Sequence, residues 1–235
     1  MISERLIEGI IQHSIDLAAE ISPVFADRTN AGHKLADVLT RQRFHNPLLI
    51  AIPSGGVPVA LPIGDRFCLP LHLAFAAKVR FASDRRFGIG AVSVSGDVIL
   101  NQELLEDLPL KDEIVKSGIE QARQIMTERM EELAAFTPPI PNLRGRTVIL
   151  VEDGIATGYT VLAAAKHIES FQPESIVITS PVTSNAAYRR LHDSGYEQVV
   201  LLKPDTQAFL VDNFYFQFPQ ISMAEVKQML NHNRT

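Results

Sequence analysis

The stretch VILVEDGIATGYT, Val148 to Thr160, leads from four aliphatic residues into two adjacent carboxylates and then into glycines and hydroxyls. An uninterrupted aliphatic run is typical of a strand that is buried on both faces, as in a parallel sheet covered by helices. Ligands of such sheets bind beyond the carboxyl ends of the strands, which is where Glu152 and Asp153 stand. The sequence therefore predicts an α/β fold with a ligand site directly after this strand.

The loop after the two acids has the composition of an anion site. Gly154 and Gly158 let the backbone curl so that several amide N–H groups converge, and Thr157 and Thr160 add hydroxyls at the start of a helix. The loop lacks the lysine of GxxxxGK[ST] and the spacing of GxGxxG, so neither a nucleoside-triphosphatase nor a dinucleotide site fits. Because a carboxylate repels phosphate, the acids must face another part of the ligand, such as sugar hydroxyls or a metal ion. A sugar phosphate meets both requirements.

The remaining pattern predicts an open doubly wound, mainly parallel sheet. We expect helices over 4–20, 30–41, 57–67, 102–135, 159–171 and 185–194, and strands over 48–52, 71–79, 147–152, 175–180 and 197–202. We also expect a mobile polar loop near 80–88, a hairpin around Ser95-Gly96-Asp97, and a last helix opened by the capping-box spacing of Ser222 and Glu225. The whole of 1–235 is predicted to be one domain, with 1–45 and 203–235 as a hood or packing additions.

Composition excludes several classes of protein. The net charge is −5 and no run rich in Lys or Arg occurs, so a nucleic-acid-binding surface is not expected. The single cysteine, Cys68, excludes an internal disulfide framework and a multi-cysteine metal site, which fits a reducing cytoplasm. Charged residues interrupt the N-terminal apolar pattern, and no apolar run is long enough to span a bilayer. We therefore expect a cytoplasmic protein without a membrane partner.

The segment Glu152 to Thr160 resembles the phosphoribosyl pyrophosphate (PRPP) binding motif of the type I phosphoribosyltransferases. The resemblance implies that Glu152 and Asp153 hold the ribose 2′- and 3′-hydroxyls and act in catalysis. It also implies Mg²⁺ bound with PRPP, reached by the two acids only through PRPP or water, and a homodimer. The implied ligands of the 5′-phosphate are the loop residues Gly154, Ile155, Ala156, Thr157, Gly158, Tyr159 and Thr160.

Two further segments resemble the diphosphate side of the same family. The turn Pro53-Ser54-Gly55-Gly56 is similar to its pyrophosphate loop, in which many relatives have Arg or Lys where Ser54 stands. Lys78 and Arg80, with the polar loop after them, look like the flexible loop that closes over the active site and excludes water. The resemblance implies that both contact diphosphate, and Arg85 or Arg86 is a candidate for the charge missing at Ser54.

The ends of the chain are less specific. Residues 25–39 resemble the N-terminal segment of a bacterial and archaeal subgroup of predicted phosphoribosyltransferases, with matches at Asp27, Arg28, Ala31 and Gly32. We interpret Asp27 or Thr29 as a helix cap and Gly32 as a helix-packing position. In the C-terminal aromatic run, Phe209 and Phe214 are candidates to stack on a nucleobase, and the alternative is a core or subunit interface.

The leading hypothesis is a phosphoribosyltransferase, which converts PRPP and a nitrogenous base into a nucleotide and pyrophosphate or runs the reverse reaction. A regulatory protein that senses PRPP or a nucleotide with little turnover stays open because Ser54 replaces a cation. A hydrolase or phosphotransferase with Asp153 as nucleophile is weaker, since the loop has no nearby lysine. The sequence does not indicate the acceptor base, because base-recognition parts vary within the family.

Overall fold

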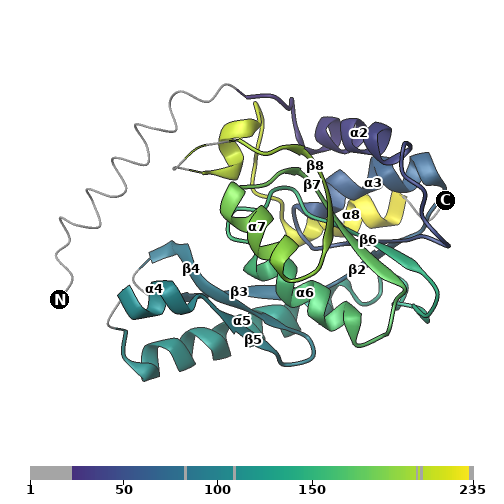
Figure 1. The fold of residues 1–235 in the computed structure, drawn as a ribbon. Coiled ribbons are helices and arrows are strands. Elements are labelled where there is room, and N and C mark those ends of the chain that lie inside the picture. The colour runs from purple at the N-terminus through teal and green to yellow at the C-terminus, as the bar shows by residue number, and fades with distance from the viewer. Residues whose placement is uncertain (1–22, 82–83, 108–109, 205, 207–208, 233–235) are drawn as a thin grey trace.

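The computed structural model describes residues 23–232 apart from 82–83, 108–109, 205 and 207–208 (Figure 1). The helix predicted over 4–20 lies outside these residues. Five parallel strands form the main sheet, in the order β2-β1-β6-β7-β8. They are β1 (Leu48–Ala51), β2 (Leu71–Leu73), β6 (Thr147–Val151), β7 (Ser175–Val182) and β8 (Glu197–Leu202). The predicted α/β class and open parallel sheet are confirmed.

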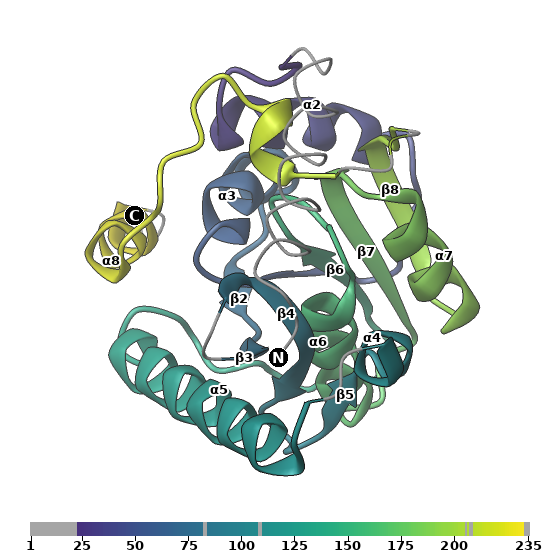
Figure 2. The ribbon, with the colours of Figure 1, turned by 90° about the vertical axis from the view of Figure 1, so that its left-hand side faces the viewer.

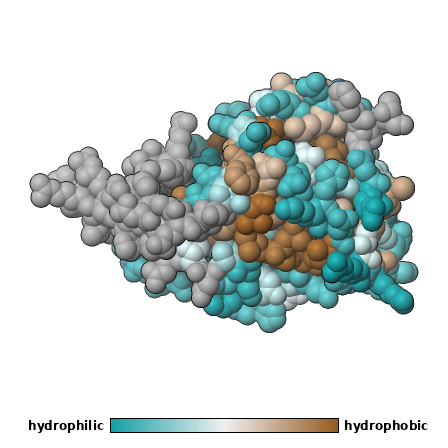
Figure 3. All heavy atoms as spheres, turned by 90° about the horizontal axis from the view of Figure 1, so that it is seen from above, coloured by the Kyte–Doolittle hydropathy of each residue, from teal (hydrophilic) through white to brown (hydrophobic). Residues whose placement is uncertain are grey.

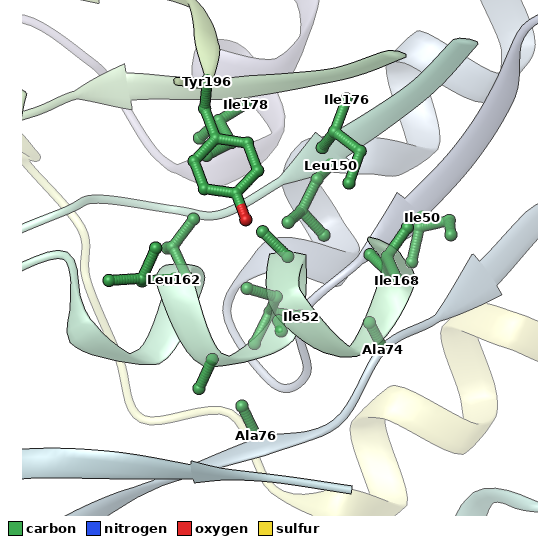
Figure 4. Packing of buried hydrophobic residues seen from close by; sticks show 14 of the residues in the cluster. Ile50, Ile52, Ala74, Ala76, Leu150, Leu162, Ile168, Ile176, Ile178 and Tyr196 are labelled. Carbon is green, nitrogen blue, oxygen red and sulfur yellow. The ribbon is translucent and has the colours of Figure 1, made fainter. Parts of the chain in front are cut away.

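Helices cover both faces of this sheet, because alternate residues of each central strand point to opposite faces. Ile50 and Leu150 pack toward α6 (Tyr159–Glu169) and α7 (Asn185–Asp193), as Figure 4 shows for α6. Leu49 and Ile149 pack in the opposite cluster with α2 (Arg28–Leu39), α3 (Gly56–Phe67) and α8 (Met223–His232). All four side chains are fully buried. This two-sided burial accounts for the continuous aliphatic runs in the sequence.

A second, antiparallel sheet stands beside the first and has the order β3-β4-β5. Its strands are β3 (Ala76–Phe81), β4 (Asp84–Ser93) and β5 (Val98–Leu100), so the hairpin predicted around Ser95-Gly96-Asp97 is confirmed. The long helix α5 (Asp112–Leu133) packs on this sheet through Ala122 and Met126 (Figure 2). The short helix α4 (Gln102–Asp107) precedes α5, and the 3-10 turn η1 (Val211–Phe214) precedes α8.

Three expected elements differ from the structure. The strand expected over 71–79 is two strands, β2 and β3, which belong to different sheets, because an apolar run suits a buried strand in either sheet and does not mark the bend between them. Most of the segment near 80–88 that was expected to be a loop is strand. Pairing with β3 satisfies the backbone hydrogen-bonding groups of β4, so a strand forms there although its side chains are polar. The helix expected over 102–135 is divided into α4 and α5, and the sequence between them contains Pro109, a residue with no N–H to donate to a continuous helix.

On the coloured part of the face seen in Figure 3, hydrophilic side chains surround a central apolar area. Large apolar side chains at the surface include Phe216, which is 71% exposed, and Leu210, which is 44% exposed. In the part of the chain that the structure describes, none of the helices is both long enough and apolar enough to cross a bilayer.

Candidate functional site

The two adjacent acids lie at the carboxyl end of β6. The Glu152 amide donates to the carbonyl of Thr179 on β7 at 3.1 Å, and the Asp153 amide donates to Glu152 Oε1, also at 3.1 Å. Arg28 Nε lies 2.7 Å from Asp153 Oδ2, and these two side chains are only 10% and 13% exposed. Asp153 therefore has a buried cation beside it, whereas Glu152 has no ion pair with any described residue.

Arg28, at the start of α2, is a site residue whose role the sequence did not predict. Its Nη1 donates to the Pro219 carbonyl at 2.9 Å, and its guanidinium carbon lies 3.5 Å from the centroid of the Phe218 ring. The Tyr215 hydroxyl donates to the Asp153 carbonyl at 2.5 Å, and burial raises the pKa of this phenol, which keeps it protonated as a donor. Arg28 and Tyr215 thus join α2 and the C-terminal segment to the end of β6.

The match over residues 25–39 was the one sequence signal that pointed to this region. As expected, Asp27 caps the first turn of α2. Gly32 allows the expected close contact with α3, because a Cβ there would lie 2.4 Å from a backbone oxygen of that helix. The contact between Arg28 and Asp153 could not be predicted from local pattern, since 125 positions separate the two residues.

The loop after the acids is held through its carbonyls. Ser184 Oγ donates to the Ala156 carbonyl and Arg190 Nη1 donates to the Thr157 carbonyl, each at 2.6 Å. Gly158 has φ +81°, a left-handed conformation that leads into α6 and favours glycine. The amides from Ala156 to Val161 have no acceptor within the described residues. Unpaired amides at a helix N-terminus attract an anion, as the sequence predicts for this loop.

These groups line one cavity of about 320 Å³, which we call the main cavity. Lys78 and Arg80 on β3 also line it, so the structure brings both predicted cations to the acids. Burial is the first cause that lowers the pKa of Lys78 and the charge of Arg80 is the second, while the charges of Glu152 and Asp153 raise it. The other lining residues are Ile52, Pro53, Ala76, Ala77, Ile125, Arg129, Gly154, Ile155, Ala156, Thr157, Gly158, Thr160, Val161, Val211 and Phe218.

A second cavity of about 550 Å³, here the side cavity, adjoins the main cavity at Asp153, Arg129 and Phe218, which line both. Ser54 and Gly55 line the side cavity, and Gly56 is buried against the end of β6, where a Cβ would lie 2.6 Å from the Val151 carbonyl. The remaining lining residues are Arg28, Gln220, Ile221, Ser222 and Met223. The predicted pyrophosphate loop therefore opens mainly into the side cavity.

The structure places the other predicted residues as follows. Tyr159 is buried, with the Arg190 guanidinium 4.3 Å from its ring centroid, and it lines neither cavity.

Phe214 is 1% exposed and packs against Phe209 with 5.3 Å between ring centroids. Both rings lie away from the two cavities, because apolar packing with the end of the sheet buries this part of the aromatic run. The ring that reaches both cavities is Phe218, which sequence reasoning did not select. The side chains of Arg85 and Arg86 lie outside the described part of the chain.

Glu152 lines the main cavity, and protein atoms crowd around its carboxyl group. Burial, followed by the neighbouring charge of Asp153, raises the pKa of Glu152 well above its ordinary value. The folded protein therefore favours protonated Glu152, and the stability that this gives is present below the unfolded pKa and lost as pH rises through the folded pKa.

We expect Glu152→Gln to raise the melting temperature relative to the wild type at about pH 8, and to change it little at about pH 4, where the wild-type carboxyl is protonated in both states. Thermal unfolding across this pH range measures the difference. An equal difference at both ends of the range would contradict the raised pKa.

The donor set of the site suits Mg²⁺ only together with ligands that do not come from the protein. No group of three or more His, Cys, Asp or Glu side chains among the described residues could hold a metal ion. The acid pair offers carboxylate oxygens, and a small hard cation often uses one or two carboxylates, with substrate phosphates and water as its other ligands. The residues present therefore fit an Mg²⁺ ion that arrives with a diphosphate, and not an ion held by the protein alone.

Comparison with known proteins identifies the family. Residues 27–213 match the family model of the phosphoribosyl transferase domain. The chain belongs to this family. Relatives from Mycobacterium tuberculosis strains H37Rv and CDC 1551 are named "Putative phosphoribosyl transferase" Rv0571c and MT0597, and each is 29% identical to this chain over 210 residues, or 88% of the chain. These matches cover 46% of each relative, so the chain spans about half the length of the curated relatives it matches.

A solved structure has a similar fold. The crystal structure of TT1426 from Thermus thermophilus is 28% identical, with a TM-score of 0.69, over 88% of this chain and 98% of that one. The resemblance that the sequence showed at Glu152 to Thr160 is thus confirmed at the level of the family and its fold.

Proposed function

We propose that this phosphoribosyl transferase family member is an Mg²⁺-dependent enzyme that transfers the 5-phosphoribosyl group between PRPP and a nitrogenous base, with pyrophosphate as co-product. The observation that carries the proposal is the main cavity, where Glu152 and Asp153 stand beside a loop with unpaired amides. The two groups of donors and acceptors match the two ends of a ribose 5-phosphate. Lys78 and Arg80 line the same cavity and add positive charge to it.

In this proposal each group acts by binding and orientation. The carboxyl oxygens of Glu152 and the carboxylate of Asp153 accept hydrogen bonds from the ribose 2′- and 3′-hydroxyls, and the loop from Gly154 to Thr160 donates to the 5′-phosphate. Bound Mg²⁺ would neutralise charge on the diphosphate. Lys78 and Arg80 donate to that diphosphate, while the acids stabilise positive charge that develops on the ribose as the glycosidic carbon changes partners.

The proposed binding place of the nitrogenous base is next to the C-terminal segment. Phe218 and residues 220–223 line the side cavity, next to the end of β6. An aromatic ring with neighbouring polar groups suits a planar nitrogenous base. We therefore propose that part of 203–235 is a hood within a single domain and that Phe218, in place of Phe209 and Phe214, contacts the base. A homodimer, expected from the resemblance, stays a prediction.

A second candidate is a protein that senses PRPP or a nucleotide without useful turnover. Two observations favour it: Ser54 supplies no charge to the pyrophosphate loop, and Asp153 is already paired with Arg28. In such a protein the cavity would bind the ligand, and its occupancy would change the contacts that Arg28 makes with the C-terminal segment.

One experiment separates these functions. Purified protein is mixed with PRPP, Mg²⁺ and a panel of purine, pyrimidine and pyridine bases, and pyrophosphate release is measured beside PRPP binding by calorimetry. We expect release that requires PRPP, Mg²⁺ and one class of base, and its loss in Glu152→Gln. Binding without release across the panel would favour the sensor, and absence of PRPP binding would contradict both functions.

A further inference from the structure

Arg129 lies at the junction of the two cavities, although nothing in its local sequence sets it apart. It stands near the C-terminal end of α5 and lines the main cavity together with Lys78 and Arg80. It also lines the side cavity, together with Ser54 and Gly55. Arg129 and Ser54 stand far apart along the chain, on α5 and directly after β1, so only the fold brings this cation to the turn.

The charge of Arg129 is not compensated within the described part of the chain. Arg129 is partly buried and has no hydrogen bond or ion pair with a described residue. Other arginines near the site differ: Arg28 is paired with Asp153, and Arg190 donates to the Thr157 carbonyl in the loop after the acids. On α5 itself, Arg123 pairs with Glu120 at 2.7 Å. A partly buried guanidinium without an acceptor is costly in free energy. An anionic ligand that accepts hydrogen bonds from Arg129 would remove this cost.

The helix that presents Arg129 is fixed on two sides. Gly118 lies against the backbone of β3, where a Cβ would be 2.5 Å from the Arg80 carbonyl. Near the other end of α5, Glu132 accepts from Lys227 of α8 at 2.7 Å. Because both contacts belong to regular secondary structure, α5 holds the base of the Arg129 side chain at the cavity wall without a loop having to close. Pre-organisation of this kind lowers the entropic cost of binding.

From this arrangement we infer that Arg129 binds the diphosphate of PRPP and supplies the cation that Ser54 does not. The inference rests on the proposed function. The 5′-phosphate loop lines the main cavity alone, whereas Arg129 reaches the side cavity with Ser54 and Gly55, which are the residues that resemble a pyrophosphate loop. A guanidinium offers several donors in one plane and can hold two oxygens of a diphosphate at once. Arg129 thus takes the role first considered for Arg85 or Arg86.

The test compares ligands that differ only in the diphosphate. Wild-type protein, Arg129→Gln and Arg129→Lys are titrated by calorimetry with PRPP and with pyrophosphate, both with Mg²⁺, and with ribose 5-phosphate. We expect Arg129→Gln to weaken the binding of PRPP and of pyrophosphate by about tenfold to fiftyfold, the value of one charge-assisted contact, and to leave ribose 5-phosphate binding unchanged. Arg129→Lys should lie between, because it keeps the charge but loses the planar fork.

Arg123→Gln is the matched control, since it removes the same charge from the same helix at a surface ion pair. It should leave all three affinities unchanged. Equal affinity of wild type and Arg129→Gln for PRPP, or an equal loss for ribose 5-phosphate, would overturn the inference while the proposed function stands. A wild-type protein that binds neither PRPP nor pyrophosphate would overturn the proposed function, and the inference with it. A loss for Arg123→Gln as large as that for Arg129→Gln would show a general charge effect and would also overturn the inference.

Discussion

Replacing Arg28 with methionine is expected to lower the free energy of unfolding by about 3 kcal/mol or more, because it leaves the Asp153 carboxylate buried without its cation. The side chains of this pair are 10% and 13% exposed, and the two charged atoms are 2.7 Å apart. The substitution also removes the donor to the Pro219 carbonyl and the guanidinium that stacks on Phe218. The loss should therefore loosen the C-terminal segment as well as the acid.

Denaturant unfolding of Arg28→Met, Asp153→Asn and the double variant measures this coupling. The double variant should be more stable than the sum of the single effects predicts, since neither charge is then left alone. Arg66→Met is the control, because Arg66 pairs with Asp37 at 3.8 Å on the surface. The loss of this exposed pair should cost about 0.5 kcal/mol or less. Additive effects in the double variant would show that the ion pair does not stabilise the fold.

Replacing Gly55 with alanine is expected to weaken the binding of ribose 5-phosphate by at least about a hundredfold, the value of losing charge-assisted hydrogen bonds to one or two hydroxyls. A Cβ at Gly55 would lie 2.0 Å from Asp153 Oδ2, so the carboxylate must move. It cannot move freely, because Arg28 holds the same oxygen. The methyl group should thus displace the acid that is proposed to hold the ribose, or break its ion pair.

Calorimetric titration with ribose 5-phosphate measures the effect of Gly55→Ala. Gly195→Ala is the control: Gly195 has φ +88° and open space around its Cβ position. We expect this control to lose about 1 kcal/mol of stability through backbone strain and to keep its affinity. Unchanged binding by a folded Gly55→Ala protein would mean that Asp153 does not hold the sugar.

Much of the fold followed from local pattern. The aliphatic runs of β1 and β6 predicted central parallel strands, and both are buried on two faces in the structure. The capping-box spacing of Ser222 and Glu225 predicted the start of α8, where Ser222 donates from its amide to Glu225 at 2.8 Å. Where pattern misled, at residues 71–79, an apolar run was shared between two sheets, and composition cannot distinguish two partners for the same kind of strand.

The candidate site, like the fold, could be predicted only in part from the sequence. Glu152 to Thr160 could be selected from sequence because one continuous segment supplies both the acids and the loop amides, and their spacing carries the chemistry. The roles of Arg28, Arg129 and Phe218 could not be predicted in this way, since an arginine on a helix or a phenylalanine in a C-terminal run is ordinary until its neighbours are known. We propose Phe218, in place of Phe209 and Phe214, as the ring that contacts the base, because packing against the sheet buries Phe214.

The sequence by itself determined the parallel sheet, the phosphate-type loop and the family, because each depends on residues that are adjacent or periodic along the chain. Only the tertiary structure decided which charges surround the acids. Arg28 comes from α2, Arg129 from α5 and Phe218 from the segment before α8, and they line the side cavity together with Asp153 because separate helices pack against the sheets. Contacts of this kind depend on burial and distance in space, which no local spacing encodes.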